Sequence, residues 1–136
     1  MNILFFLTPK AEVAFIKEDM TLRQTMEKME NHRYTCVPMI RVDGTYLGTI
    51  TEGDLLWAIK NQYIMNLKEA EKSPISEIRR KRDYVPANVN ENMEGVFKLA
   101  MTQNFVPVVD DYGAFIGLIT RKAIIQYCRD QLFPED

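Results

Sequence analysis

Apolar and polar positions follow the same order twice along the chain. An extended stretch, at 13–16 and again at 84–89, precedes a segment whose apolar residues recur at helical spacing. Two short apolar strands joined by a glycine-containing turn follow, and a second helical segment closes each copy. The pattern therefore predicts a βαββα unit that occurs twice.

The helical segments carry their apolar residues on one stripe. In the first helix of each copy these are Leu22, Met26 and Met29, and then Met93, Val96, Phe97, Ala100 and Met101. In the closing helices they are Leu55, Leu56 and Ile59, and then Ile124, Ile125 and Cys128. Thr21 with Gln24 predicts a capping box, and Asn92 predicts an N-cap. We expect the helical methionines to fill the core.

A gap-free alignment supports the duplication. Residues 37–51 (VPMIRVDGTYLGTIT) align with 106–120 (VPVVDDYGAFIGLIT), and each aligned pair is 69 positions apart. We assign repeat 1 with a connecting helix to 1–72 and repeat 2 to 73–136. We expect the first closing helix to continue to Ser73-Pro74, where proline starts a new short helix.

A three-stranded unit of this kind leaves one face of its sheet uncovered. We therefore expect a mixed α+β fold in which the two repeats pack sheet to sheet with pseudo-two-fold symmetry. The cleft between such halves is where a small ligand is expected to bind.

Composition and charge narrow the classes of function. The 136 residues carry a net charge of -2, which gives no general attraction to nucleic acid or to an anionic membrane. Two distant cysteines and one histidine support neither a disulfide framework nor a zinc site, so a cytoplasmic location is expected. The apolar run within MNILFFLTPK is too short for a signal sequence or a membrane span, so we expect it to belong to the fold.

The two repeats differ at one position of chemical interest. The second strand ends on Thr51 in repeat 1, with Asp54 three residues later, whereas repeat 2 has Thr120 followed by Ala123. Threonine and aspartate at this spacing can form a capping box, although aspartate is expected to reach back less well than glutamate. A carboxylate is also an acceptor-only group.

Repeat 2 places two cations where this helix begins. Arg121 and Lys122 directly follow Thr120, at the end where the helix dipole disfavours positive charge. Together with helix N–H groups they could hold an anion. The alternative is that both side chains extend into solvent.

These features together resemble the tandem cystathionine-β-synthase (CBS) domain pair, or Bateman module, over nearly the whole chain. The resemblance rests on the VPMI and VPVV strands, the glycine–strand–threonine segments and the spacing from Thr51 to Asp54. It implies a non-catalytic module that binds AMP, ADP, ATP, S-adenosylmethionine or a cyclic dinucleotide between its repeats. It further implies a homodimer, and a stand-alone member of the family acting on a separate, unidentified protein.

The resemblance also implies roles for individual residues. Asp54 would accept both ribose hydroxyls, Thr51 would contact ribose or phosphate, and Arg33 would contact phosphate. Thr35 would line the adenine pocket. The complete set of predicted nucleotide-binding residues is Thr51, Asp54, Arg33, Thr35, Thr120, Arg121 and Lys122. No catalytic residue, metal or required cofactor is expected, the adenine nucleotide being a regulatory ligand.

Three alternatives stay open. The segment ITRK (119–122) resembles a basic turn of small CBS receptors for cyclic di-AMP, although Asp54 favours a mononucleotide. An interaction protein with vestigial pockets is the second. Nucleic-acid binding through RRKR (79–82) is the third, but no aromatic platform accompanies that run. In the family one of these arginines can reach phosphate, and the sequence does not say which. No nucleophile beside a base and no phosphate-binding glycine loop supports an enzyme.

Overall fold

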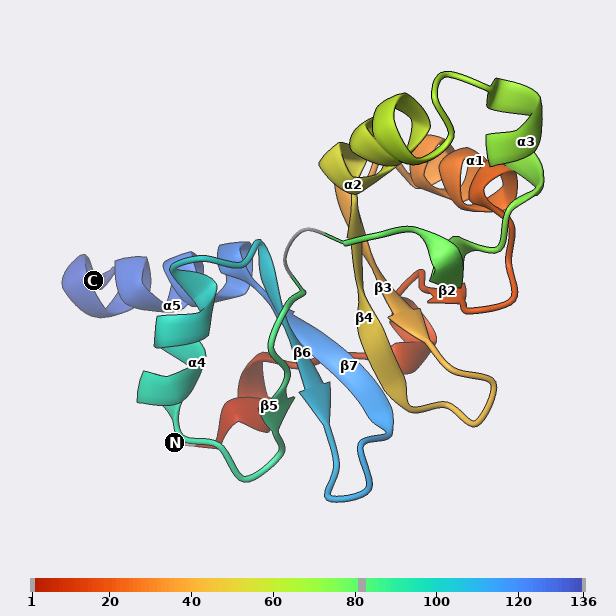
Figure 1. Cartoon of the computed structure of the whole chain (residues 1–136). Coiled ribbons are helices and arrows are strands. Elements are labelled where there is room, and N and C mark those ends of the chain that lie inside the picture. Colours follow the sequence, from red (N-terminus) through yellow and green to blue (C-terminus); the bar gives the residue numbers. More distant parts are fainter. Residues whose placement is uncertain (1, 81–82, 136) are drawn as a thin grey trace. The chain divides into compact units, whose positions relative to one another are not determined.

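The computed structural model describes residues 2–80 and 83–135, which form two compact units (Figure 1). The repeat-1 unit is Ala14–Asp83, and the repeat-2 unit combines the N-terminal residues up to Val13 with the chain from Tyr84 onward. The predicted boundaries, 1–72 and 73–136, follow the duplication. The compact units follow contacts instead, and these assign the N-terminal segment to the second repeat.

The repeat-1 unit contains a three-stranded sheet in the order β2-β3-β4. Its strands are β2 (Ile16–Lys17), β3 (Cys36–Ile40) and β4 (Tyr46–Thr51). Strand β2 is parallel to β3, and β3 is antiparallel to β4. The helical elements are α1 (Leu22–His32), α2 (Glu52–Trp57), the π-helical turn η3 (Ala58–Gln62), α3 (Leu67–Lys72) and the 3-10 turn η4 (Ile75–Glu77).

The repeat-2 unit contains a four-stranded sheet in the order β1-β7-β6-β5. Its strands are β1 (Thr8–Pro9), β5 (Ala87–Asn88), β6 (Phe105–Val109) and β7 (Phe115–Thr120). Its helical elements are η1 (Ile3–Phe6), η2 (Lys10–Glu12), α4 (Met93–Ala100) and α5 (Arg121–Leu132). The predicted βαββα order is confirmed in both repeats, and the N-terminal segment adds β1 to the second sheet.

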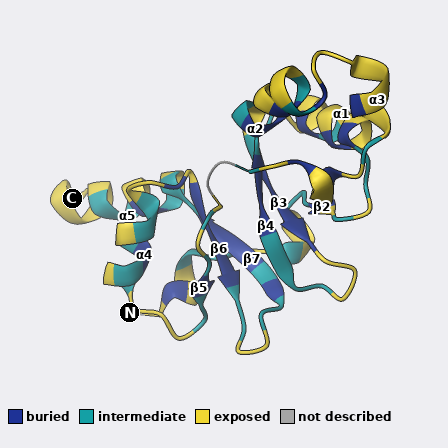
Figure 2. Cartoon of the chain, in the orientation of Figure 1, coloured by how far each residue is buried: buried dark blue, intermediate teal, exposed yellow. Residues whose placement is uncertain are grey.

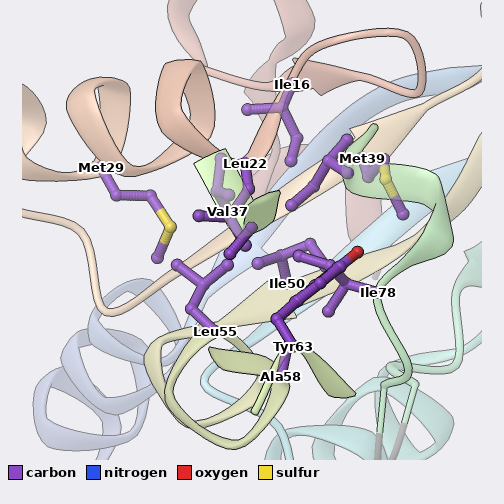
Figure 3. Packing of buried hydrophobic residues seen from close by; sticks show 12 residues of the cluster. Ile16, Leu22, Met29, Val37, Met39, Ile50, Leu55, Ala58, Tyr63 and Ile78 are labelled. Carbon is purple, nitrogen blue, oxygen red and sulfur yellow. The ribbon is translucent and has the colours of Figure 1, made fainter. Parts of the chain in front are cut away.

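Each unit has its own apolar core, which follows the strands and the inner faces of the helices (Figure 2). In the repeat-1 unit, Leu22 from α1, Val37 from β3 and Ile50 from β4 meet in one cluster (Figure 3). In the repeat-2 unit the cluster includes Ile3, which is 0% exposed. The prediction that the N-terminal apolar run belongs to the fold is therefore confirmed.

The predicted caps are present. Thr21 Oγ1 accepts the Gln24 N–H at 3.1 Å, and Gln24 Oε1 accepts the Thr21 N–H at 2.9 Å. The Asn92 side chain accepts the Gly95 N–H at 2.9 Å. These bonds satisfy backbone donors that the first turns of α1 and α4 leave without helical partners.

Several details of the helix prediction are wrong. Three residues of the predicted apolar stripes are exposed, namely Met26 (40%), Leu56 (57%) and Ile125 (64%). Met101 follows the end of α4 and is 80% exposed, so it does not belong to the buried stripe. The first closing helix does not continue to Ser73 either, because Ile64 and Met65 adopt left-handed backbone with φ of 50° and 63°. Pro74 precedes the 3-10 turn as its N-cap residue, where the missing N–H of proline costs no hydrogen bond.

Close packing of neighbouring chain explains why glycine recurs in both second strands. At Gly117 the backbone has φ of 154°, and a Cβ there would lie 2.3 Å from the carbonyl oxygen of Thr8 on β1. At Gly48 a Cβ would lie 2.6 Å from Asp83 Oδ1 and 2.9 Å from Arg80 Nε. In each unit, residues from the segment that precedes a repeat therefore lie directly against the second strand of the sheet.

The hairpin turns use the predicted glycines. Gly44 and Gly113 have φ of 91° and 81°, a backbone conformation that residues with a Cβ rarely adopt. In the first turn the Asp43 carboxylate accepts the Thr45 hydroxyl at 2.7 Å and the Thr45 N–H at 3.0 Å. The hydrogen bond from the Thr45 side chain is the main reason that the pKa of Asp43 lies below its usual value.

Candidate functional site

Thr51 and Asp54 form a reciprocal capping box where β4 passes into α2. Thr51 Oγ1 accepts the Asp54 N–H at 3.1 Å, and Asp54 Oδ2 accepts the Thr51 N–H at 3.0 Å. The expectation that aspartate reaches back poorly is wrong here. Because the backbone of Thr51 is extended, its N–H faces the first turn within reach of the shorter side chain.

The capping box fixes the position of the Asp54 carboxylate. Asp54 is only 6% exposed. A carboxylate has about four acceptor positions, so one hydrogen bond from a backbone N–H does not by itself prevent it from accepting others. The same side chain can therefore cap α2 and take part in ligand binding, so the two interpretations of this residue are compatible.

Asp54 lines a hollow of about 320 Å³, together with Trp57, Asn61, Arg79 and Arg80. We call it the Asp54 hollow. Asp54 and Trp57 come from one face of α2, Asn61 comes from the π-helical turn, and the two arginines come from the segment after η4. It combines a carboxylate with two guanidinium groups, which suits a ligand that carries both hydroxyls and negative charge.

Arg80 anchors the segment that carries both arginines. Its Nε and Nη2 atoms donate to Asp83 Oδ1 and Oδ2 at 2.6 and 3.0 Å, and its side chain is 15% exposed. Asp83 Oδ1 also accepts the Thr49 N–H from β4 at 3.4 Å. The bidentate pair therefore ties this segment to the strand that leads into Asp54.

Arg33 and Thr35 do not line the Asp54 hollow. Arg33 caps the C-terminus of α1 with φ of 56°, and it lines other hollows beside Glu27 and Glu30. The Thr35 carbonyl accepts the Glu52 N–H at 3.0 Å, which places Thr35 beside the start of α2. His32 stacks on Tyr34 with ring centroids 5.3 Å apart at the end of α1.

The remaining predicted residues belong to the repeat-2 unit. Thr120 Oγ1 caps α5 by accepting the Ala123 N–H at 3.1 Å. Arg121 donates to the Ala100 carbonyl at 2.9 Å and to Asn104 Oδ1 at 3.1 Å, so its guanidinium connects α5 to the end of α4. Lys122 is exposed and has no partner among residues 2–80 and 83–135. The structure thus gives Arg121 a role within its own unit.

Two residues that the sequence analysis did not single out, Gln103 and Tyr84, fix the segment that leads into β5. Gln103, 4% exposed, accepts the Val85 N–H at 2.7 Å and donates to the carbonyls of Val85 and Phe105 at 3.1 and 3.3 Å. The Tyr84 hydroxyl accepts the Asn104 N–H at 3.0 Å, and its ring packs edge-on against Phe105. The sequence did contain an indication that this position matters. The repeat alignment places Gln103 and Asn104 opposite Tyr34 and Thr35, and Thr35 is itself a predicted site residue.

A metal site and a membrane-spanning helix each place requirements on the described part of the chain. Residues 2–80 and 83–135 contain no group of three or more His, Cys, Asp or Glu side chains that could hold a metal ion. Within the same part of the chain, no helix combines the length and the apolar composition needed to cross a bilayer.

Two duplicated α+β units with a threonine-capped helix after each second strand define a tandem-repeat module. The chain belongs to the CBS domain family: the family model matches residues 7–61 and again 75–130, so the chain carries two CBS domains in tandem. No curated protein is significantly similar to it in sequence.

Solved structures match the chain over nearly its full length. A CBS domain protein from Streptococcus pneumoniae TIGR4 is 25% identical, with a TM-score of 0.84 over 95% of this chain and 87% of that one. CbpB in complex with c-di-AMP is 24% identical, with a TM-score of 0.85 over 97% and 87%. CBSX2 in complex with AMP is 20% identical, with a TM-score of 0.76 over 96% and 98%. These likenesses confirm the mixed α+β fold of two CBS repeats.

Proposed function

We propose that this protein is a non-catalytic sensor that binds an adenosine-containing ligand and passes its occupancy to a separate protein. The ligand's ribose lies in the Asp54 hollow, where the carboxylate accepts its two hydroxyls and Thr51 lies beside it. The observation that carries the proposal is one buried, positionally fixed carboxylate in a hollow that also contains two guanidinium groups.

The family comparisons support this choice of ligand class. The fold-related CBSX2 was solved with AMP, and the fold-related CbpB with c-di-AMP. Both ligands contain adenosine, and a carboxylate that accepts two hydroxyls is suited to an unesterified ribose. The proposal places the protein in the cytoplasm as a homodimer that regulates an unidentified partner.

A thermal-shift screen tests the proposal. The purified protein is heated with AMP, ADP, ATP, S-adenosylmethionine and cyclic di-AMP, each over a range of concentrations. A ligand present at 100 times its Kd stabilises the folded state by about 2.7 kcal/mol, so the midpoint rises with concentration. If none of the five compounds moves the midpoint, the protein is an interaction module with vestigial pockets.

A cyclic di-AMP receptor is the second candidate, favoured by the fold match to a CbpB complex. In a 3′,5′-cyclic dinucleotide the 3′ oxygen is esterified, so Asp54 would meet one hydroxyl in place of two. Asp54→Ala would then weaken cyclic di-AMP less than it weakens AMP. Isothermal titration of both ligands against both proteins separates the two candidates.

A further inference from the structure

A second hollow adjoins the Asp54 hollow and shares three of its residues. It has a volume of about 250 Å³ and is lined by Trp57, Ala58, Asn61, Gln62 and Arg79. Trp57, Asn61 and Arg79 line both hollows. Small-molecule sites usually measure about 300–1,000 Å³, a range whose lower end the Asp54 hollow alone only just reaches.

The second hollow is rich in donors. Its lining contains one guanidinium, two side-chain amides and an indole N–H, and none of its lining residues is acidic. Lys60 adds another cation nearby, with its ammonium 5.4 Å from the centroid of the Trp57 ring. This chemistry suits a negatively charged group and not a second sugar.

Arg79 is the cation available to such a group. Its backbone N–H donates to Gln62 Oε1 at 3.2 Å, and Gln62 Nε2 donates to the Glu77 carbonyl at 2.8 Å, so its main chain is held in place. Within residues 2–80 and 83–135 its guanidinium has no hydrogen-bond or ion-pair partner. Arg80, by contrast, donates to Asp83 from both its Nε and its Nη2 atoms.

We infer that the phosphate chain of the ligand runs from the Asp54 hollow across Arg79 into the second hollow, which makes the protein selective for nucleoside 5′-polyphosphates. The inference rests on the proposed function, because it takes the ribose position at Asp54 as its origin. It selects Arg79 from the basic run 79–82, of which Lys81 and Arg82 lie outside the described residues. It also excludes S-adenosylmethionine as the ligand, because the Arg79 guanidinium would repel the sulfonium cation of that compound.

Titration with adenosine, AMP, ADP and ATP tests the inference on the full chain. In the wild type, affinity should rise about tenfold or more from AMP to ATP, because charge-assisted hydrogen bonds to Arg79 and donors of the second hollow are added. Arg79→Gln should weaken ATP by about 10- to 100-fold and leave adenosine within about twofold. Asn61→Ala should weaken ATP more than AMP.

Arg23→Gln is the matched control, because it removes the same charge from an exposed residue of α1 that lines neither hollow. It should leave the AMP-to-ATP ratio unchanged. Equal affinities for AMP and ATP, or a loss at Arg79→Gln that is as large for adenosine as for ATP, would overturn the inference. If adenosine compounds bind through Asp54 without a dependence on phosphate number, the proposed function stands and the inference fails. If none binds, both fail.

Discussion

At the scale of single residues, Asp54 combines a structural and a proposed functional role. Its carboxylate closes the capping box at the start of α2, and it lines the hollow that also contains Arg79. A substitution therefore changes stability and binding together. The two effects separate only if a variant keeps the cap.

Asp54→Asn keeps an oxygen that can accept the Thr51 N–H but loses the negative charge. We expect its stability without ligand to fall by less than about 1 kcal/mol, since substitution of a cap by alanine typically costs about that much. Asp54→Ala removes the cap and both acceptors, and should weaken an adenosine ligand by about 2 to 4 kcal/mol, or roughly 30- to 1000-fold. Urea unfolding and isothermal titration of both variants measure the two effects. Unchanged affinity in Asp54→Ala would exclude this residue from the site.

The role proposed for Asp54 follows from the sequence, whereas the proposed choice of cation follows from the fold. The spacing from Thr51 and the absence of a carboxylate at Ala123 are both visible in the repeat alignment. Arg121, Arg33 and Arg79 look alike in sequence. Only the folded chain shows that Arg121 is committed to Ala100 and Asn104, while Arg79 lines the same hollow as Asp54.

At the scale of elements, the second strand of each repeat depends on a glycine for a reason that differs between repeats. Gly117 packs against backbone, whereas Gly48 packs against the ends of two side chains. Backbone cannot move aside as an arginine or aspartate side chain can. Apolar periodicity predicted the strands themselves. The difference between the two glycines could not be predicted in that way, because it depends on which segment of the folded chain lies against each strand.

Gly117→Ala should therefore destabilise the protein more than Gly48→Ala. We expect a loss of about 2 kcal/mol or more at Gly117, where a Cβ would collide with the Thr8 carbonyl at a strained φ. At Gly48 the expected loss is less than about 1 kcal/mol, with displacement of the Arg80–Asp83 pair. Chemical denaturation of both variants gives the order, and the reverse order would contradict this account.

Gln103 joins the end of α4 to the segment that enters β5. Gln103→Leu removes three hydrogen bonds from a buried position and should cost about 2 kcal/mol of unfolding free energy. Tyr84→Phe removes only the hydroxyl that accepts the Asn104 N–H, and should cost about 1 kcal/mol. Hydrogen exchange at Val85 should speed up in the first variant and not in the second.

At the scale of the whole molecule, the two repeats share an architecture but differ in the side chains at the start of the closing helix. Repeat 2 has Ala123 where repeat 1 has Asp54, and its Arg121 is bound within its own unit. Duplication of the fold is plain in the sequence because apolar periodicity determines it. The difference between the two helix starts is only partly visible there: Ala123 can be read from the sequence, whereas the contacts of Arg121 arise from folding.

We expect one adenosine ligand per chain. Isothermal titration should give a stoichiometry near one. Asp54→Ala should lower the affinity of this single class of sites, and no second class with the wild-type affinity should remain. A stoichiometry near two in the wild type would show that repeat 2 binds without a carboxylate.

The repeat-2 unit should not fold without the N-terminal segment. A fragment of residues 84–136 lacks Ile3 from its core and β1 from the edge of its sheet. We expect it to be largely unfolded by circular dichroism, and to gain structure when a peptide of residues 1–13 is added. The same peptide with Ile3→Asp serves as the control and should have no effect, because it would place a charge in the apolar core.

This arrangement has a consequence for how the protein is made. The residues of β1 are translated well before those of β7, with which they pair. At about 5–20 residues per second, the N-terminal apolar residues wait roughly 6 to 24 s for translation to reach the end of α5. Ala14–Asp83 can meanwhile fold on the emerging chain, so the repeat-1 unit can form before β1 meets β7.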